Sequence, residues 1–193
     1  MENIINVGDL KYKITIEWKE KRKYRTYYKA VLANIEQNKE KLLTFVLFNP
    51  STADEYKFDK TLLNCEKIAR LTGYNGFEIY NLLSIKNSKV KAAVSDENKA
   101  KAYNINTLQI DFSNKDIVLA WGSFSGDKNK PFIRNIVKEF INKIPKDVYT
   151  FCKNTKDYPF HPKNFNEKRC LKCHNNKLKL VEFDLSKIDI DKK

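Results

Sequence analysis

The sequence predicts an α/β domain with three layers, in which a four-stranded, mainly parallel central sheet lies between two layers of helices. Two observations predict this fold. Short apolar runs recur along the chain, and segments with a helical apolar stripe separate them. Strands that helices cover on both faces are apolar throughout, and an alternation of strands and helices gives parallel pairing. Alternating polar and apolar residues near both termini predict an extra edge strand at each end.

The first expected element is a half-exposed strand over residues 11–18, because KYKITIEW alternates polar and apolar side chains. A basic stretch with interleaved tyrosines, KEKRKYRTYYK, follows at 19–29. Such a stretch can contact a phosphate backbone and stack on bases, and it can equally form a solvated edge of the sheet. Both interpretations stay open from the sequence.

The four strands of the central sheet are expected from four apolar runs. These are LTFVLF at 43–48, FEIYNLL at 77–83, DIVLAW at 116–121 and DVYTFC at 147–152. The spacing of apolar residues predicts helices at 60–71, 99–108 and 131–141. Gly73 is placed to end the first helix and Pro131 to begin the last. The alternating segment 177–185 predicts the C-terminal edge strand.

Length and composition restrict the class of protein. The 193 residues suit a single domain over 1–193, with a core at 24–165 and a C-terminal extension at 166–193. The net charge of +13 indicates either a polyanionic partner or a Lys-rich surface encoded by an AT-rich genome. The sequence has no secretory start and no run long enough for a membrane span, so we expect a cytoplasmic protein with reduced thiols and no membrane partner. Composition does not define the oligomeric state.

Candidate site residues lie at or after the ends of the four strands expected from the apolar runs. Ligands bind beyond the carboxyl ends of the strands in an open α/β sheet, so these residues form the candidate site. They are Asn49-Pro50-Ser51-Thr52-Ala53-Asp54 after the first run, Asn81 in the second, Trp121-Gly122-Ser123 in the third and His161-Pro162 after the fourth. The alternative for Ser51, Thr52 and Asp54 is a capping role at the next helix.

The order of several short motifs resembles that of the family catalogued as domain of unknown function 1643, over residues 24–165. The motifs are FVLFNPSTAD, Asp59-Lys60-Thr61, IYNLLS, AWGS and a late HP. More distantly, the same order resembles the uracil-DNA glycosylase superfamily. In that superfamily an Asp-Pro or Asn-Pro motif follows the first strand, an Asn ends the second, and a His-Pro or Asn-Pro motif follows the fourth. This resemblance implies a uracil-DNA-glycosylase-like form of the predicted fold.

The superfamily resemblance implies roles for individual residues. Asn49 matches the position that orients or activates water, and Asn81 matches the side chain that reads a base edge through paired hydrogen bonds. His161 matches the residue that stabilises negative charge on the departing base. Phe48 is placed to stack under a base, or simply to end a buried strand.

Two departures from the superfamily pattern restrict the substrate. The His-Pro motif continues as Lys163-Asn164-Phe165 instead of Ser-Pro-Leu and a side chain that wedges into the duplex, which puts duplex DNA as the substrate in question. The first motif continues as Ser-Thr-Ala-Asp and lacks the aromatic residue of the efficient uracil enzymes. Uracil is therefore not the expected base.

The leading hypothesis is a DNA glycosylase, an N-glycosyl hydrolase that recognises a modified or mismatched base, with DNA or a nucleotide as its partner. Asn49, Asp54 and His161 are the expected catalytic residues. The expected substrate-binding residues are Phe48, Pro50, Ser51, Asp59, Asn81, Trp121 and Ser123. The alternative is a non-catalytic module that binds a nucleotide or nucleic acid, such as a phage or defence-related interaction protein.

A cysteine cluster near the C-terminus is a second candidate site. Cys170-Leu171-Lys172-Cys173-His174 has the CxxCH pattern of haem attachment, but a cytosolic chain argues against haem. Cys152, Cys170 and Cys173 with His174 or His161 have the ligand chemistry of a tetrahedral zinc site. An iron–sulfur cluster fits the cysteine spacing poorly. The expectation is no cofactor and reduced thiols, with zinc as the alternative.

Overall fold

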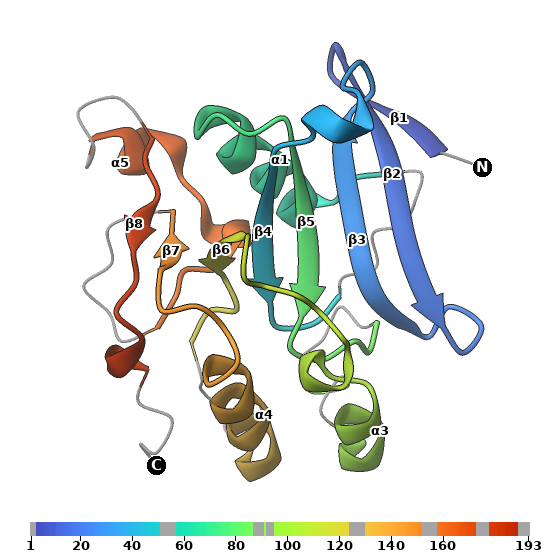
Figure 1. The fold of residues 1–193 in the computed structure, drawn as a ribbon, viewed down its shortest axis with the longest axis vertical. Coiled ribbons are helices and arrows are strands. Elements are labelled where there is room, and N and C mark those ends of the chain that lie inside the picture. Colours follow the sequence, from blue (N-terminus) through green and yellow to red (C-terminus); the bar gives the residue numbers. More distant parts are fainter. Residues whose placement is uncertain are drawn as a thin grey trace.

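The fold is built on one eight-stranded sheet, with the strand order β1-β2-β3-β5-β4-β6-β7-β8. A computed structural model describes residues 3–50, 57–86, 91, 95–123, 130–151, 158–172 and 178–188. Its strands are β1 (Asn3–Val7), β2 (Leu10–Lys19), β3 (Tyr24–Leu32), β4 (Leu42–Leu47), β5 (Gly76–Asn81), β6 (Asp116–Leu119), β7 (Val148–Thr150) and β8 (Val181–Glu182) (Figure 1).

The described helices are α1 (Lys60–Leu71), α3 (Glu97–Ala102), α4 (Pro131–Ile141) and α5 (Glu167–Lys172). Short 3₁₀ turns accompany them at η1 (Gln37–Lys39), η2 (Ile105–Thr107), η4 (Pro162–Asn164) and η5 (Leu185–Lys187). Among the described residues, none of these helices has the length and apolar content that crossing a bilayer requires.

The α/β class is confirmed, but the predicted four-stranded, mainly parallel sheet is not. β5, β4, β6 and β7 pair in parallel with their neighbours in this group. The four remaining pairings, β1 with β2, β2 with β3, β3 with β5 and β7 with β8, are antiparallel. The sheet is therefore mixed. The N-terminal strands form a three-stranded antiparallel extension, because β2 and β3 are joined by a tight turn that only antiparallel strands allow.

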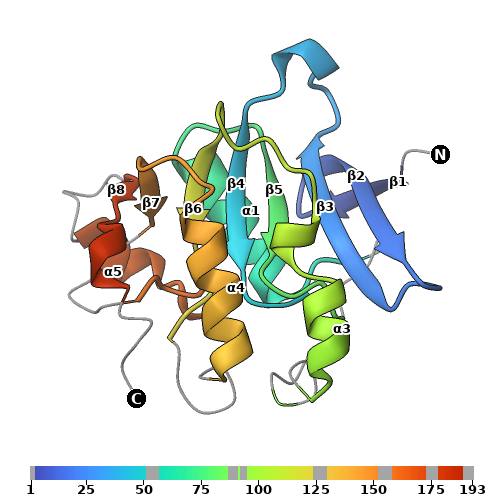
Figure 2. The same ribbon diagram turned by 60° about the horizontal axis from the view of Figure 1, so that its bottom comes forward.

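Two apolar cores cover the two faces of the sheet. Figure 2 shows α3 and α4 in front of the sheet, with α1 behind it. The first lies between the sheet and α1, and it includes Phe45, Phe77 and Ile79. The second lies between the sheet and α3, η2 and α4, and it includes Val46, Leu119 and Phe140. Since alternate residues of a strand point to opposite faces, β4 and β6 contribute to both cores. This double burial explains why their sequences are apolar throughout.

Local signals in the sequence set the ends of α1 and α4. The Asp59 carboxylate accepts a hydrogen bond from the backbone N–H of Leu62 at 2.9 Å, which caps the first turn of α1. Gly73 follows α1 with a left-handed φ of 90°. Pro131 occupies the start of α4, where its missing N–H costs nothing. Both helices have the bounds that the apolar spacing predicts.

Several predicted elements are shorter than expected, among them the helix at 99–108 and the C-terminal edge strand. The predicted helix at 99–108 is the six-residue α3 followed by the separate turn η2, because Asn104 interrupts it. The Asn104 side chain accepts from the N–H of Asn106 at 2.9 Å, which begins the 3₁₀ turn instead of continuing the helix. The predicted edge strand at 177–185 is reduced to the two residues of β8, which pair with the end of β7.

Replacing Gly76 with Ala is expected to destabilise the fold by about 3 kcal/mol, as strong overpacking does. A Cβ atom at Gly76 would lie 2.6 Å from the Ala30 carbonyl oxygen and 2.9 Å from the Val31 Cα, which are backbone atoms of the paired strand β3. Urea denaturation measures the change. The matched control is Gly73→Ala, which meets nothing within 4 Å and carries only the cost of a left-handed backbone, about 1–2 kcal/mol. Equal losses for the two variants would contradict the steric argument.

Candidate functional site

The carboxyl ends of β4, β5 and β6 lie level with one another. The backbone N–H of Leu82 donates to the Leu47 carbonyl and that of Leu83 to the Phe48 carbonyl, both at 2.9 Å. On the other side of β4, the N–H of Ala120 donates to the Val46 carbonyl at 2.9 Å. The chain runs from β4 to β5 on one side and then crosses to β6 on the other. The ends of β4 and β6 therefore form the topological switch point at which open α/β sheets bind ligands.

Asn81 is the buried polar residue at this edge. It ends β5 and shares a face with Phe77 and Ile79, so its amide lies on the α1 side of the sheet. The side chain is 1% exposed, and neither its oxygen nor its nitrogen has a hydrogen-bond partner within the part of the chain that the structure describes. An unsatisfied buried polar group costs about 1–3 kcal/mol. A buried amide that bears this cost is a candidate for ligand binding.

Asn49, Pro50 and Asp59 belong to the connection between β4 and α1. Asn49 is half-buried, and its Nδ2 donates to the Pro50 carbonyl at 3.1 Å. Pro50 is buried. Asp59 caps α1, so its carboxylate lies at the positive end of that helix, on the same side of the sheet as Asn81. Ser51 and Asp54 lie outside the described residues.

His161 precedes η4, and η4 packs against α1. The Asn64 Nδ2 in α1 donates to the Pro162 carbonyl at 2.7 Å, which fixes η4 against that helix. The His161 Nδ1 accepts from the N–H of Lys163 at 3.1 Å. A neutral imidazole whose Nδ1 accepts in this way carries its proton on Nε2. Asn81, Asp59 and His161, which are far apart in the sequence, thus come from elements packed on one face of the sheet.

Phe48 and Trp121 point to the opposite face. Both are buried in the core that α4 covers, and the Trp121 ring meets the Phe140 ring edge-on with centroids 6.2 Å apart. Strand alternation explains this placement, because Phe48 follows Leu47 and therefore leaves the α1 face. The two rings thus lie at the strand ends, on the α4 side of the sheet. Ser123 is half-buried and follows Gly122, whose φ is 78°. Roles for these three side chains in substrate binding stay predictions.

Arg25 is a buried cation at the same edge that the sequence did not single out. Its side chain is 1% exposed, and its guanidinium lies 5.1 Å from the centre of the Tyr28 ring. Burial lowers the pKa of Arg25 to about 10, against the opposing influence of Tyr28, Asp59 and Cys65, so the group stays charged at neutral pH. A buried guanidinium on the α1 side of the edge is suited to an anionic or polarised ligand.

A β-bulge brings Arg25 to this face. Glu17 pairs with Tyr27 and Trp18 with Arg25, so one residue of β3 is left out of the register. In a regular strand Arg25 would lie on the face opposite Tyr28. The bulge turns its guanidinium over the Tyr28 ring instead, as bulges near sites commonly do. Periodicity could not find this residue, since it lay within a basic stretch whose alternation the bulge breaks.

The cysteine cluster is only partly described. Cys170 lies in α5 and is buried in the core next to α1. Cys152, Cys173 and His174 lie outside the described residues, so the proposed zinc set stays a prediction. Among the described residues, no three His, Cys, Asp or Glu side chains gather closely enough to hold a metal ion.

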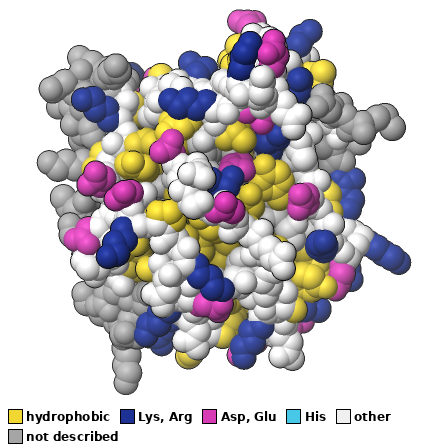
Figure 3. Space-filling model, in the orientation of Figure 1, with side chains coloured by type: hydrophobic (Ala, Val, Ile, Leu, Met, Phe, Trp, Pro, Cys, Tyr) yellow, Lys and Arg dark blue, Asp and Glu magenta, His cyan; other side chains and the backbone are white. Residues whose placement is uncertain are grey.

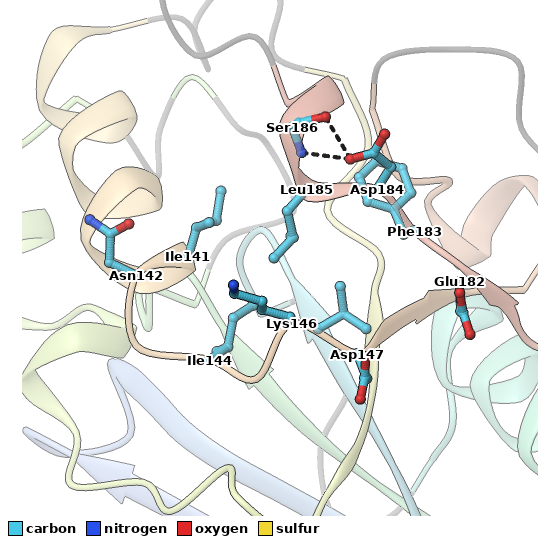
Figure 4. Close-up of a pocket in the computed structure, with 11 residues that line it drawn as sticks. Ile141, Asn142, Ile144, Lys146, Asp147, Glu182, Phe183, Asp184, Leu185 and Ser186 are labelled. Carbon is cyan, nitrogen blue, oxygen red and sulfur yellow. Dashed lines mark hydrogen bonds between the residues drawn. The ribbon is translucent and has the colours of Figure 1, made fainter.

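A separate hollow of about 700 Å³ lies at the opposite end of the sheet, between the end of α4 and the segment from β8 to η5 (Figure 4). Ile141 and Leu185 project into it from α4 and from η5 (Figure 4). The Asp184 Oδ1 accepts from the backbone N–H and the hydroxyl of Ser186 at 3.0 and 2.6 Å. These contacts serve the local turn, and none of the described residues that line the hollow belongs to the strand ends near Asn81.

The fold and the polar edge define a class: an α/β protein that presents buried polar groups at the carboxyl ends of its parallel strands. Within this class the chain belongs to the family described as Protein of unknown function (DUF1643), whose model matches residues 16–163. This match confirms the resemblance of the sequence motifs to domain of unknown function 1643. No curated protein matches the chain, and no solved structure matches it either.

Proposed function

We propose that the edge formed by Asn81, Arg25, Asp59 and His161 recognises a nucleobase, and that the protein acts as an N-glycosylase on a modified or mismatched base in DNA. The observation that carries the proposal is the Asn81 amide. It offers a donor and an acceptor side by side, and neither is used among the described residues. The edge of a base presents the complementary pair, so binding a base would satisfy both groups at once.

Two further features support this proposal. The order β5-β4-β6-β7 numbers the parallel strands 2-1-3-4, which is the order of a doubly wound sheet with its ligand site at the ends of the first and third. The resemblance to the uracil-DNA glycosylase superfamily assigns roles to Asn49, Asn81 and His161, which follow or end β4, β5 and β7. A uracil-DNA-glycosylase-like form of the fold is part of the proposal.

The proposed reaction breaks the glycosidic C–N bond. The base leaves with the bonding electron pair, the sugar becomes oxocarbenium-like, and a water molecule adds to C1′. The Nε2–H of His161 is the donor for the negative charge on the departing base, and preorganised donors of this kind contribute strongly to rate. Asn49 Oδ1 orients the water, and the carboxylate of Asp54 or Asp59 accepts its proton.

An abasic-site assay tests the reaction. The protein is incubated with labelled duplex and single-stranded oligonucleotides that each carry one modified or mismatched base, and alkali converts any abasic site into a strand break. We expect cleavage with at least one base, and a rate about 10²–10³ lower for His161→Ala if that side chain stabilises the departing base. A folded protein that gives no abasic product across a broad panel would contradict the proposed glycosylase activity.

A second candidate is a module that binds a base or nucleotide without cleaving it. The observation that favours it is that the Asp59 carboxylate already accepts the Leu62 N–H as a helix cap at 2.9 Å, so one of its oxygens is engaged in the fold and not with a water molecule. This candidate predicts saturable binding that depends on Asn81, with the substrate recovered intact. The same oligonucleotide panel, followed for both binding and cleavage, separates the two functions.

A further inference from the structure

The turn between β2 and β3 carries a dense group of cations. Lys19, Lys21, Arg22 and Lys23 are all exposed, and Glu20 is the acid among them. Within the described chain, no ion pair is formed by Lys19, Lys21 or Lys23. Figure 3 shows basic and acidic side chains interspersed over one face of the molecule. We call residues 18–23 together with Lys86 the hairpin tip.

The backbone of the hairpin tip is held in an unusual conformation. Glu20, Lys21 and Arg22 have φ angles of 45°, 51° and 69°, and the turn is closed by a hydrogen bond from the Lys23 N–H to the Glu20 carbonyl at 3.1 Å. Left-handed backbone costs about 1–2 kcal/mol at each residue other than glycine. Such strain persists where the surrounding structure fixes the segment, and it is frequent at functional sites.

Three contacts fix the β2–β3 turn and the start of β3 to the loop after β5 and to the end of α3. The Glu20 carboxylate accepts a hydrogen bond from the Tyr103 hydroxyl. The Tyr103 ring stacks on Tyr24, with centroids 3.9 Å apart. The backbone N–H of Lys86 donates to the Lys23 carbonyl at 3.0 Å. The cations of the tip are therefore displayed on a fixed backbone, and the only acid of the turn is already engaged.

The one aromatic residue of the hairpin tip, Trp18, is also engaged. The Arg22 guanidinium lies 5.2 Å and the Lys86 ammonium 5.0 Å from the centre of the Trp18 ring. Proteins that bind single strands offer open aromatic rings on which bases stack. Here the indole orients two cations instead. This arrangement favours contact with phosphates over stacking on unpaired bases.

The hairpin tip lies at the same end of the molecule as the candidate site (Figure 1). The backbone N–H of Arg25 donates to the Ser84 carbonyl at 2.8 Å, and Tyr24 forms a bridge with Ile85. Ser84 is only three residues beyond Asn81. We propose that the hairpin tip binds the phosphate backbone of duplex DNA beside the base that the Asn81 edge recognises. The inference rests on the proposed function, because it names the partner of the same site.

Salt-dependent binding of the full chain to an unmodified, labelled duplex tests this inference. Each lysine that contacts a phosphate contributes about 0.9 to the slope of log K against log salt. We expect the variant Lys19→Gln, Lys21→Gln, Lys23→Gln to lower this slope by about 2–3 and to weaken binding at 100 mM salt by at least about tenfold. The matched control is Lys11→Gln, Lys41→Gln, Lys146→Gln, which removes the same charge from the opposite end of the sheet.

The outcomes separate the inference from its alternatives. A slope that the control lowers as much as the tip variant would show that net charge alone drives binding, and it would overturn the inference. No binding of the wild type at 50 mM salt, or equal tip-dependent binding to anionic lipid vesicles, would overturn it as well. Because the duplex contains no modified base, a protein without glycosylase activity still reports on the hairpin tip. Thermal unfolding confirms that both variants are folded.

Discussion

Replacing Asn81 with Leu is expected to stabilise the protein and at the same time to remove base recognition. The wild-type amide is buried with both polar atoms unsatisfied among the described residues. An apolar side chain of similar volume removes that cost, so the free energy of unfolding should rise by about 1–3 kcal/mol. Loss of a bidentate contact should weaken binding of the cognate base or nucleotide by about 10–100-fold. Urea denaturation and a titration with the oligonucleotides that bind in the panel measure the two effects.

Asn104→Leu is the matched control for this prediction. Asn104 is also buried, but its Nδ2 donates to the carbonyls of Ala100 and Lys101, and its Oδ1 accepts from the N–H of Asn106. The control should lose stability and keep recognition. A loss of stability in Asn81→Leu, with unchanged ligand affinity, would identify Asn81 as a structural residue and remove the basis of the proposed function.

Replacing Glu78 with Ala is expected to lower the free energy of unfolding by about 3–5 kcal/mol, since it removes one partner of a buried ion pair. The Glu78 carboxylate lies on the face opposite Asn81. Its Oε1 accepts from the Lys115 ammonium at 2.6 Å and from the Thr44 hydroxyl at 2.7 Å, and its Oε2 accepts from the Tyr27 hydroxyl at 2.9 Å. Without the carboxylate, three donors lose their acceptor. Urea or thermal denaturation measures the loss.

An exposed ion pair provides the comparison for Glu78. Glu139 and Lys143 form a pair at 2.6 Å with both side chains about half exposed, so Glu139→Ala should change stability by less than about 1 kcal/mol. The double variant Glu78→Leu, Lys115→Met should recover much of the loss, because it removes both charges from the interior. A small effect of Glu78→Ala would mean that solvent reaches the pair in the native state.

The predictable part of the fold follows from burial. The apolar runs of β4 and β6 and the stripes of α1 and α4 reflect contacts on both faces of the sheet, so periodicity locates these elements with correct bounds or nearly so. Strand pairing could not be predicted in this way, because the residue pattern of β3 does not indicate which strands lie beside it. β3 lies between β2 and β5 and extends the sheet in the antiparallel sense, which a count of apolar runs does not indicate.

The candidate site was predictable to the same extent. Asn81 could be located because strand ends and helix starts converge in an open α/β sheet. The structure places it there, with an amide that forms no hydrogen bond to any described residue. Arg25 could not, since a one-residue bulge determines which face it joins. Phe48 shows the same dependence on strand alternation, because it lies on the face opposite Asn81. One residue of alternation separates the face of Asn81 from the face that α4 covers.

The position of β5 has a consequence for binding affinity. This strand is hydrogen-bonded to β3 on one side and to β4 on the other, at the junction between the antiparallel and parallel parts of the sheet. A strand held on both sides opens only when most of the domain unfolds. Asn81 at its end is therefore preorganised, and a ligand that binds there loses little affinity to the ordering of the residue that receives it.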